Sequence, residues 1–108
     1  MSTRATILIK EGNEKVHIYH HHDGYPDGVG KDLKSYLKGV KYWDAGDIAN
    51  DLIKGKVNSD DEYEFTTCQH GDEAYGYLID CDNRTITCYC LHWDEYDWSK
   101  CEIIEIPD

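Results

Sequence analysis

Apolar and polar residues alternate along six short stretches of the chain, the pattern of half-buried β-strands. Turn residues divide neighbouring stretches at residues 11–14 and at Asp82-Asn83, so two hairpins are expected. The predicted strands cover residues 3–10, 15–21, 62–69, the two halves of 75–91, and 101–106.

Two helices are predicted between the second and third strands, where apolar residues recur every three to four positions. The first covers residues 28–38 and is followed by Gly39, a residue that commonly ends helices. The second covers residues 45–54 and has Asp44 or Asp47 as its N-cap.

The order of these elements is β-β-α-α-β-β-β-β, without the strand–helix–strand alternation of parallel α/β proteins. It predicts an α+β fold in which an antiparallel sheet carries both helices on one face. The length of 108 residues fits a single domain spanning residues 1–108.

The composition changes the expected core. Ile, Leu, Val and Phe together number only 21 of 108 residues, which with high net charge would be typical of disorder. However, the chain also has nine Tyr and three Trp, and each aromatic ring buries a large area. We therefore expect a folded domain whose core is rich in Tyr and Trp.

The charge narrows the class of partner. Lys and Arg number 11 against 22 Asp and Glu, a net charge of −11, whereas phosphate binding needs clustered basic residues. Nucleic acid and anionic membranes are thus excluded as main partners. The N-terminus lacks a signal-peptide pattern and no apolar run reaches about 18 residues, so a cytoplasmic protein is expected.

The negative charge belongs to the second half of the chain. Residues 1–54 hold eight basic and eight acidic side chains, whereas residues 55–108 hold three and fourteen. Aromatic residues stand among these acids, a combination typical of interface anchors. The candidate partner-binding residues are Asp60, Asp61, Glu62, Tyr63, Asp94, Glu95, Tyr96, Asp97 and Trp98. A basic protein surface would complement them; the alternative is a solvated surface with its tryptophans packed inward.

A second candidate site is the histidine-rich segment of residues 19–30. If the preceding strand extends to residue 22, His20 and His22 share a face, as half of a metal site or an acid–base pair would. The candidate ligand-binding residues are His20, His22, Asp23, Tyr25 and Asp27. The alternative is a structural loop. Gly28 and Gly30 lower the helix propensity of the first turn, and a close approach by backbone or ligand would explain that cost.

The five cysteines are expected to be reduced thiols that pack as small apolar residues. A zinc site formed by Cys68, His70, Cys88, Cys90 and His92 is an alternative, but the C-x-C-x-H spacing is not usual for structural zinc. No catalytic, P-loop or dinucleotide motif occurs. Catalytic residues, metal and cofactor are therefore not predicted.

One part of the sequence resembles a group of small phage and mobile-element proteins with a Y-[RH]-x-x-D-G-Y-P-x-G-x-G motif. The matching residues are Ser2-Thr3-Arg4-Ala5, Tyr19-His20, Asp23-Gly24-Tyr25-Pro26, Gly28, Gly30 and residues 45–53. The chain departs from the pattern at His22, where an aromatic residue is common, and in its cysteine-rich, acidic second half. The resemblance implies a setting in a bacterial host, not a mechanism.

Three functions follow as hypotheses. The first is a non-enzymatic, phage-type inhibitor of host defence, similar to anti-CRISPR proteins, that docks on a basic, nucleic-acid-binding host protein. The second is a small-molecule- or nucleotide-binding domain, or a metal-dependent hydrolase, that uses residues 19–30. The third is a structural or assembly protein, for which a homodimer formed through strand edges is an option.

Overall fold

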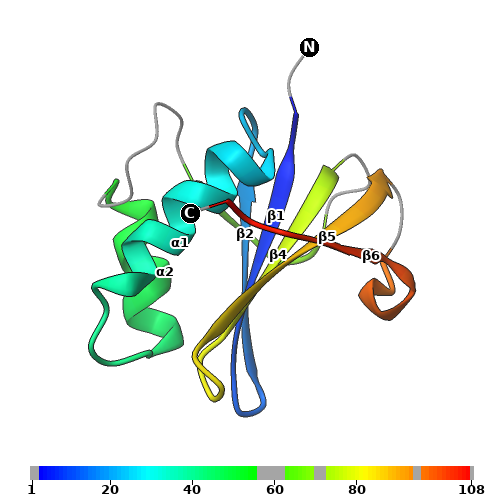
Figure 1. Cartoon of the computed structure of the whole chain (residues 1–108). Coiled ribbons are helices and arrows are strands. Elements are labelled where there is room, and N and C mark those ends of the chain that lie inside the picture. The colour runs from blue at the N-terminus through cyan, green and yellow to red at the C-terminus, as the bar shows by residue number, and fades with distance from the viewer. Residues whose placement is uncertain (1–2, 56–62, 70–72, 94–95, 108) are drawn as a thin grey trace.

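The computed structural model describes residues 3–55, 63–69, 73–93 and 96–107, and the side chains of all of these except His92 and Trp93. They form a six-stranded sheet with two α-helices (Figure 1). The elements are β1 (Ala5–Glu11), β2 (Glu14–His20), the helical turn η1 (Pro26–Gly30), α1 (Lys31–Lys38), α2 (Ala45–Ile53), β3 (Tyr63–Thr66), β4 (Glu73–Asp80), β5 (Thr85–Trp93), the helical turn η2 (Trp98–Lys100) and β6 (Glu102–Ile104). The α+β class, the six strands and the two helices are confirmed.

The prediction of a purely antiparallel sheet is wrong, because the two central strands are parallel. The strand order is β3-β2-β1-β4-β5-β6, and only β1 and β4 run in the same direction. After β3, the chain returns to the end of the sheet where β1 begins, and the Ala74 amide donates to the Arg4 carbonyl over 2.9 Å. Apolar alternation has the same period in both pairings, so the pattern alone does not encode strand direction.

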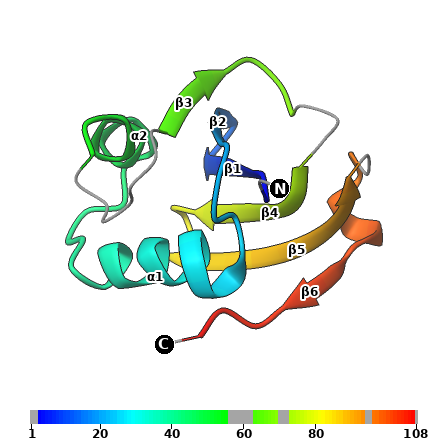
Figure 2. The same ribbon diagram turned by 90° about the horizontal axis from the view of Figure 1, so that it is seen from above.

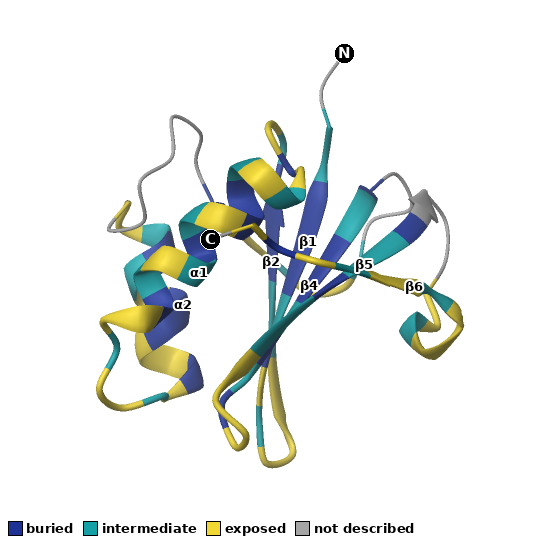
Figure 3. Cartoon of the chain, viewed as in Figure 1, coloured by how far each residue is buried: buried dark blue, intermediate teal, exposed yellow. Residues whose placement is uncertain are grey.

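The core lies between one face of this sheet and the two helices. Figure 2 shows α1 and α2 on one side of the sheet and the orange turn η2 on the other. The buried residues follow β1 and the sheet-facing sides of the helices, whereas the hairpin tips are exposed (Figure 3). The largest completely buried core side chains are Tyr77, Ile7, Ile9, Ile18, Leu33, Ile48, Leu52 and Ile79.

Helix α2 is fixed at its N-terminus by two carboxylates. Asp44 Oδ1 accepts from the Asp47 amide over 2.9 Å, as expected for an N-cap. In addition, Glu11 Oε1, at the end of β1, accepts from the Ala45 amide over 2.8 Å. Both helices are short, and within the described ranges no helix has the length and hydrophobicity needed to cross a membrane.

Candidate binding groove on the helix-free face

Three rows of side chains cross the face of the sheet that the helices leave uncovered. They come from alternate residues of β2, β1, β4 and β5, as strand pairing aligns them. The aromatic row is Tyr19, Thr6, Gly76 and Tyr89; the middle row is His17, Leu8, Leu78 and Thr87; the lysine row is Lys15, Lys10, Asp80 and Thr85.

A groove of about 550 Å³ lies over these rows. Leu8 and Leu78 form its apolar floor. The residues that line it above the sheet come from two connections, and they are Cys68, Gln69, Tyr96, Asp97, Trp98 and Ser99. A volume of this order is that of a small-molecule site.

Trp98 closes the aromatic end of the groove. Its ring packs directly on Gly76, where an added Cβ atom would lie only 2.8 Å from Cζ2, so any larger residue at position 76 would displace the ring. The ring also lies 5.4 Å, centroid to centroid, from Tyr89. Its indole nitrogen donates to Gln69 Oε1 over 2.8 Å. The β3–β4 and β5–β6 connections are therefore joined over the sheet by one side chain.

The opposite end of the groove is cationic. Lys10 and Lys15 are direct neighbours in the lysine row, and both line the groove. Partial burial, and secondarily the charge of Lys15, lower the pKa of His17 in the middle row. A group that neutralised Lys15 would remove the second of these effects.

The groove includes only some of the candidate partner-binding residues that the sequence predicted. Tyr96 is 60% exposed and Asp97 is exposed, whereas Trp98 is half-buried. Tyr63 is only 4% exposed, because its ring packs 4.4 Å from the ring of His20 under the helices. The remaining members, Asp60, Asp61, Glu62, Asp94 and Glu95, lie outside the described residues.

The histidine-rich segment does not gather its candidate residues at one place. His20 is completely buried on the helix side of β2. In contrast, His22, Asp23, Tyr25 and Asp27 are all exposed. None of the five lines the groove.

The glycines of this segment have a structural explanation. Tyr77 Oη donates to the Gly24 carbonyl over 2.7 Å, which ties the loop to the sheet. A Cβ on Gly28 would lie 2.5 Å from the Asp23 carbonyl oxygen, and one on Gly30 would lie 2.9 Å from Tyr77 Cε1. The close approach expected from these glycines is thus made by the protein's own backbone and by Tyr77.

The cysteines are free thiols with different environments. Burial raises the pKa of Cys81 and of Cys88 to about 11, so neither is activated as a nucleophile. Cys68 is exposed at the groove. Among the described residues, no group of three His, Cys, Asp or Glu side chains is placed to hold a metal ion. His70 and the side chain of His92 lie outside that description.

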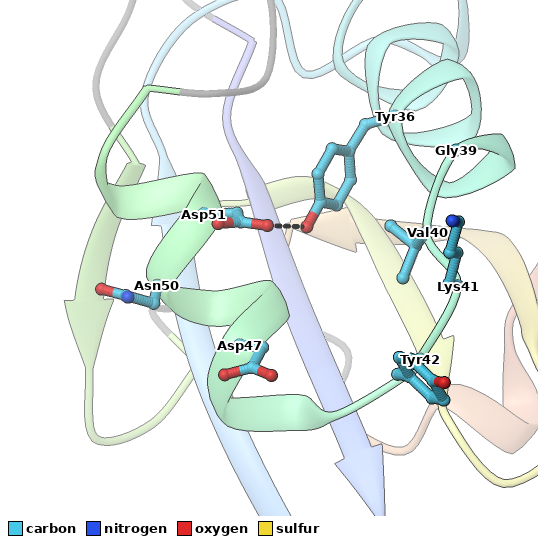
Figure 4. A pocket seen from close by; sticks show the side chains of 8 residues that line it. All are labelled: Tyr36, Gly39, Val40, Lys41, Tyr42, Asp47, Asn50 and Asp51. Carbon is cyan, nitrogen blue, oxygen red and sulfur yellow. Dashed lines mark hydrogen bonds between the residues drawn. The ribbon is translucent and has the colours of Figure 1, made fainter.

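A second pocket, of about 480 Å³, lies between the helices (Figure 4). Tyr36 on α1 donates its hydroxyl to Asp51 Oδ2 on α2 over 2.6 Å, and burial together with this carboxylate raises the pKa of Tyr36. Tyr42 at the rim is 82% exposed. This hydrogen bond joins α1 to α2, so the packing of the two helices explains the Tyr36–Asp51 pair without a ligand.

Comparisons with protein-family models, with curated proteins and with solved structures find no match to this chain.

Sequence reasoning missed the floor and the cationic end of the groove. Leu8, Lys10 and His17 alternate with the core residues of β1 and β2, so strand periodicity alone places them together on the outer face. Tyr89 likewise alternates with the neighbouring residues of β5. Gln69 carried no such signal, because its place depends on the path of a connection over the sheet.

Proposed function

We propose that the protein is a non-enzymatic binding protein that docks on the basic surface of a nucleic-acid-binding protein. The observation that carries this proposal is the exposed pair of Tyr96 and Asp97 at the rim of the groove. An aromatic ring beside a carboxylate suits a basic surface, because the ring can stack on guanidinium groups while the carboxylate pairs with them.

The local structure supports this role. Asp97 Oδ1 accepts from the amide and hydroxyl of Ser99, over 3.1 and 2.6 Å, which orders the backbone beside Tyr96. Trp98 then anchors the segment on Gly76. A segment that is ordered before binding loses less conformational entropy on binding.

The charge of the whole chain supports the class of partner. A net charge of −11 attracts a basic surface over long range and raises the rate of association. With the phage-type resemblance of the N-terminal half, the proposed activity is inhibition of a host defence protein. The inhibitor would occupy the surface on which that protein binds nucleic acid.

Affinity capture from a bacterial lysate, followed by binding measurements on the purified partner, tests this proposal. We expect a basic partner whose complex weakens between about 0.1 and 0.5 M salt and is displaced by nucleic acid. Tyr96→Ala should weaken binding about tenfold or more. Tyr42→Ala, which removes an exposed tyrosine on the helix side, is the matched control.

Two results would overturn the proposal. One is a partner that binds nucleic acid and this protein simultaneously, without competition. The other is equal affinity of the Tyr96→Ala and Tyr42→Ala variants for the partner.

A further inference from the structure

We propose that the groove on the helix-free face is a small-molecule site for a planar aromatic ring that carries a phosphate, of the size of a nucleoside monophosphate. This inference goes beyond docking on a protein partner, because it concerns the interior of the groove rather than its rim. Three features carry it: an aromatic end, a cationic end, and the spacing between them.

The aromatic end offers a stacking surface. Trp98 and Tyr89 lie in contact, with a centroid distance of 5.4 Å, and Tyr96 is a further aromatic residue that lines the groove. Stacking of a base on an aromatic side chain is among the strongest contacts available to a nucleotide and is tolerant of base identity. The apolar floor of Leu8 and Leu78 excludes water beside that surface.

The cationic end offers charge for one phosphate. Lys10 and Lys15 are paired across β1 and β2 in the lysine row. His17 lies two residues from Lys15 on β2, in the adjacent middle row. Asp80 stands beside Lys10 in the same row; its hydrogen bond from the Asn83 side-chain amide, over 2.8 Å, and to a lesser degree the charge of Lys10 lower its pKa. Because Asp80 offsets part of the charge of Lys10, Lys15 is the main charge that the groove offers to a phosphate.

The two ends are separated by a distance that suits one nucleotide. Four residues along a strand separate the aromatic row from the lysine row, which corresponds to about 13 Å. Flexible lysine side chains can shorten the span to the phosphate. The groove volume of about 550 Å³ lies within the range of small-molecule sites. Polymeric nucleic acid does not suit the site, because the net charge of −11 repels a polyanion.

Calorimetric titration of the full chain tests the proposal, with adenosine 5′-monophosphate as the probe and adenosine, inorganic phosphate and indole-3-acetate as comparisons. We expect the nucleotide to bind at least about tenfold more tightly than each comparison compound, because only the nucleotide reaches both ends with a phosphate. Lys15→Ala should weaken nucleotide binding about 5- to 10-fold. Lys54→Ala, an exposed lysine after α2, should leave it unchanged.

The stacking contact has its own test. Trp98→Leu should weaken nucleotide binding by about tenfold or more. In a background with both Trp43→Phe and Trp93→Phe, where Trp98 is the remaining tryptophan, bound nucleotide should quench the tryptophan fluorescence. If Trp98→Leu fails to fold, the comparison of Lys15→Ala with Lys54→Ala still tests whether the nucleotide binds in the groove. If adenosine bound as tightly as the nucleotide, the lysines would not bind the phosphate. If indole-3-acetate bound more tightly than the nucleotide, the site would not be specific for a phosphate. If the nucleotide did not bind at about 1 mM, the groove would not be a nucleotide site.

Discussion

Tyr77 joins the loop of residues 23–30 to the centre of the sheet. Its ring is completely buried under η1, and its hydroxyl donates to the Gly24 carbonyl. Burial raises the pKa of this phenol, so the hydroxyl stays protonated and remains a donor. Gly30 is the glycine that this large side chain requires, because a Cβ there would lie 2.9 Å from Tyr77 Cε1.

At this residue scale, we predict that Gly30→Ala destabilises the protein by about 1–3 kcal/mol, because the new methyl group would overpack against the Tyr77 ring. Urea unfolding monitored by circular dichroism measures the change. Gly39→Ala is the matched control, since its Cβ would have only an ordinary contact with the Tyr36 carbonyl, at 3.7 Å. Equal stability of the two variants would show that Tyr77 does not require a glycine at position 30.

Hydrogen bonds between the ends of elements add to the packing of the core. Glu11 connects the end of β1 to the N-terminus of α2. Asp82, in the β4–β5 turn, accepts from the Gly12 amide in the β1–β2 turn over 2.8 Å. These bonds fix the relative positions of two hairpins and a helix that are separate in sequence.

At the element scale, we predict that Asp44→Ala and Glu11→Ala each lower the free energy of unfolding by about 1 kcal/mol, because each leaves a helix-terminal amide without its carboxylate acceptor. Thermal and urea unfolding measure both effects. Asp47→Ala serves as the control, because its side chain is exposed within α2 and provides neither bond. A cost for Asp47→Ala as large as that for Asp44→Ala would contradict the capping role.

Across the whole molecule, the neutral and acidic halves of the sequence are interleaved. β1 lies between β2 from its own half and β4 from the other half. The principal dimensions are 33 × 30 × 27 Å. At about 0.01 M salt the screening length is about 30 Å, so every acidic group repels all the others across the molecule.

At this scale, we predict that the melting temperature rises between about 0.01 and 0.2 M sodium chloride, because salt screens the repulsion created by a net charge of −11. Differential scanning calorimetry measures this dependence. A variant with Glu102→Lys and Glu105→Lys, both exposed, should show a weaker dependence on salt. A melting temperature that falls with salt would mean that attractive ion pairs outweigh the repulsion.

The sequence was sufficient to predict those parts of the fold that depend on local residue patterns. The hairpins, the two helices and the Asp44 cap follow from periodicity and from residue preferences. The parallel pairing of β1 with β4 did not follow, because strand direction depends on a distant part of the chain. Likewise, sequence proximity to acids suggested that Tyr63 was a surface residue, whereas its strand buries it against His20.

The central position of β1 also affects how the chain folds during synthesis. A nascent chain that ends at residue 55 already contains β1, β2, α1 and α2 but lacks Tyr77 and the strand that pairs with the second edge of β1. The β1–β2 hairpin is local, whereas the β1–β4 contact joins residues about 70 positions apart, and such contacts slow folding. Until β4 is made, the unpaired edge of β1 is open to other chains, so chaperones that bind exposed strands would act on this protein at that stage.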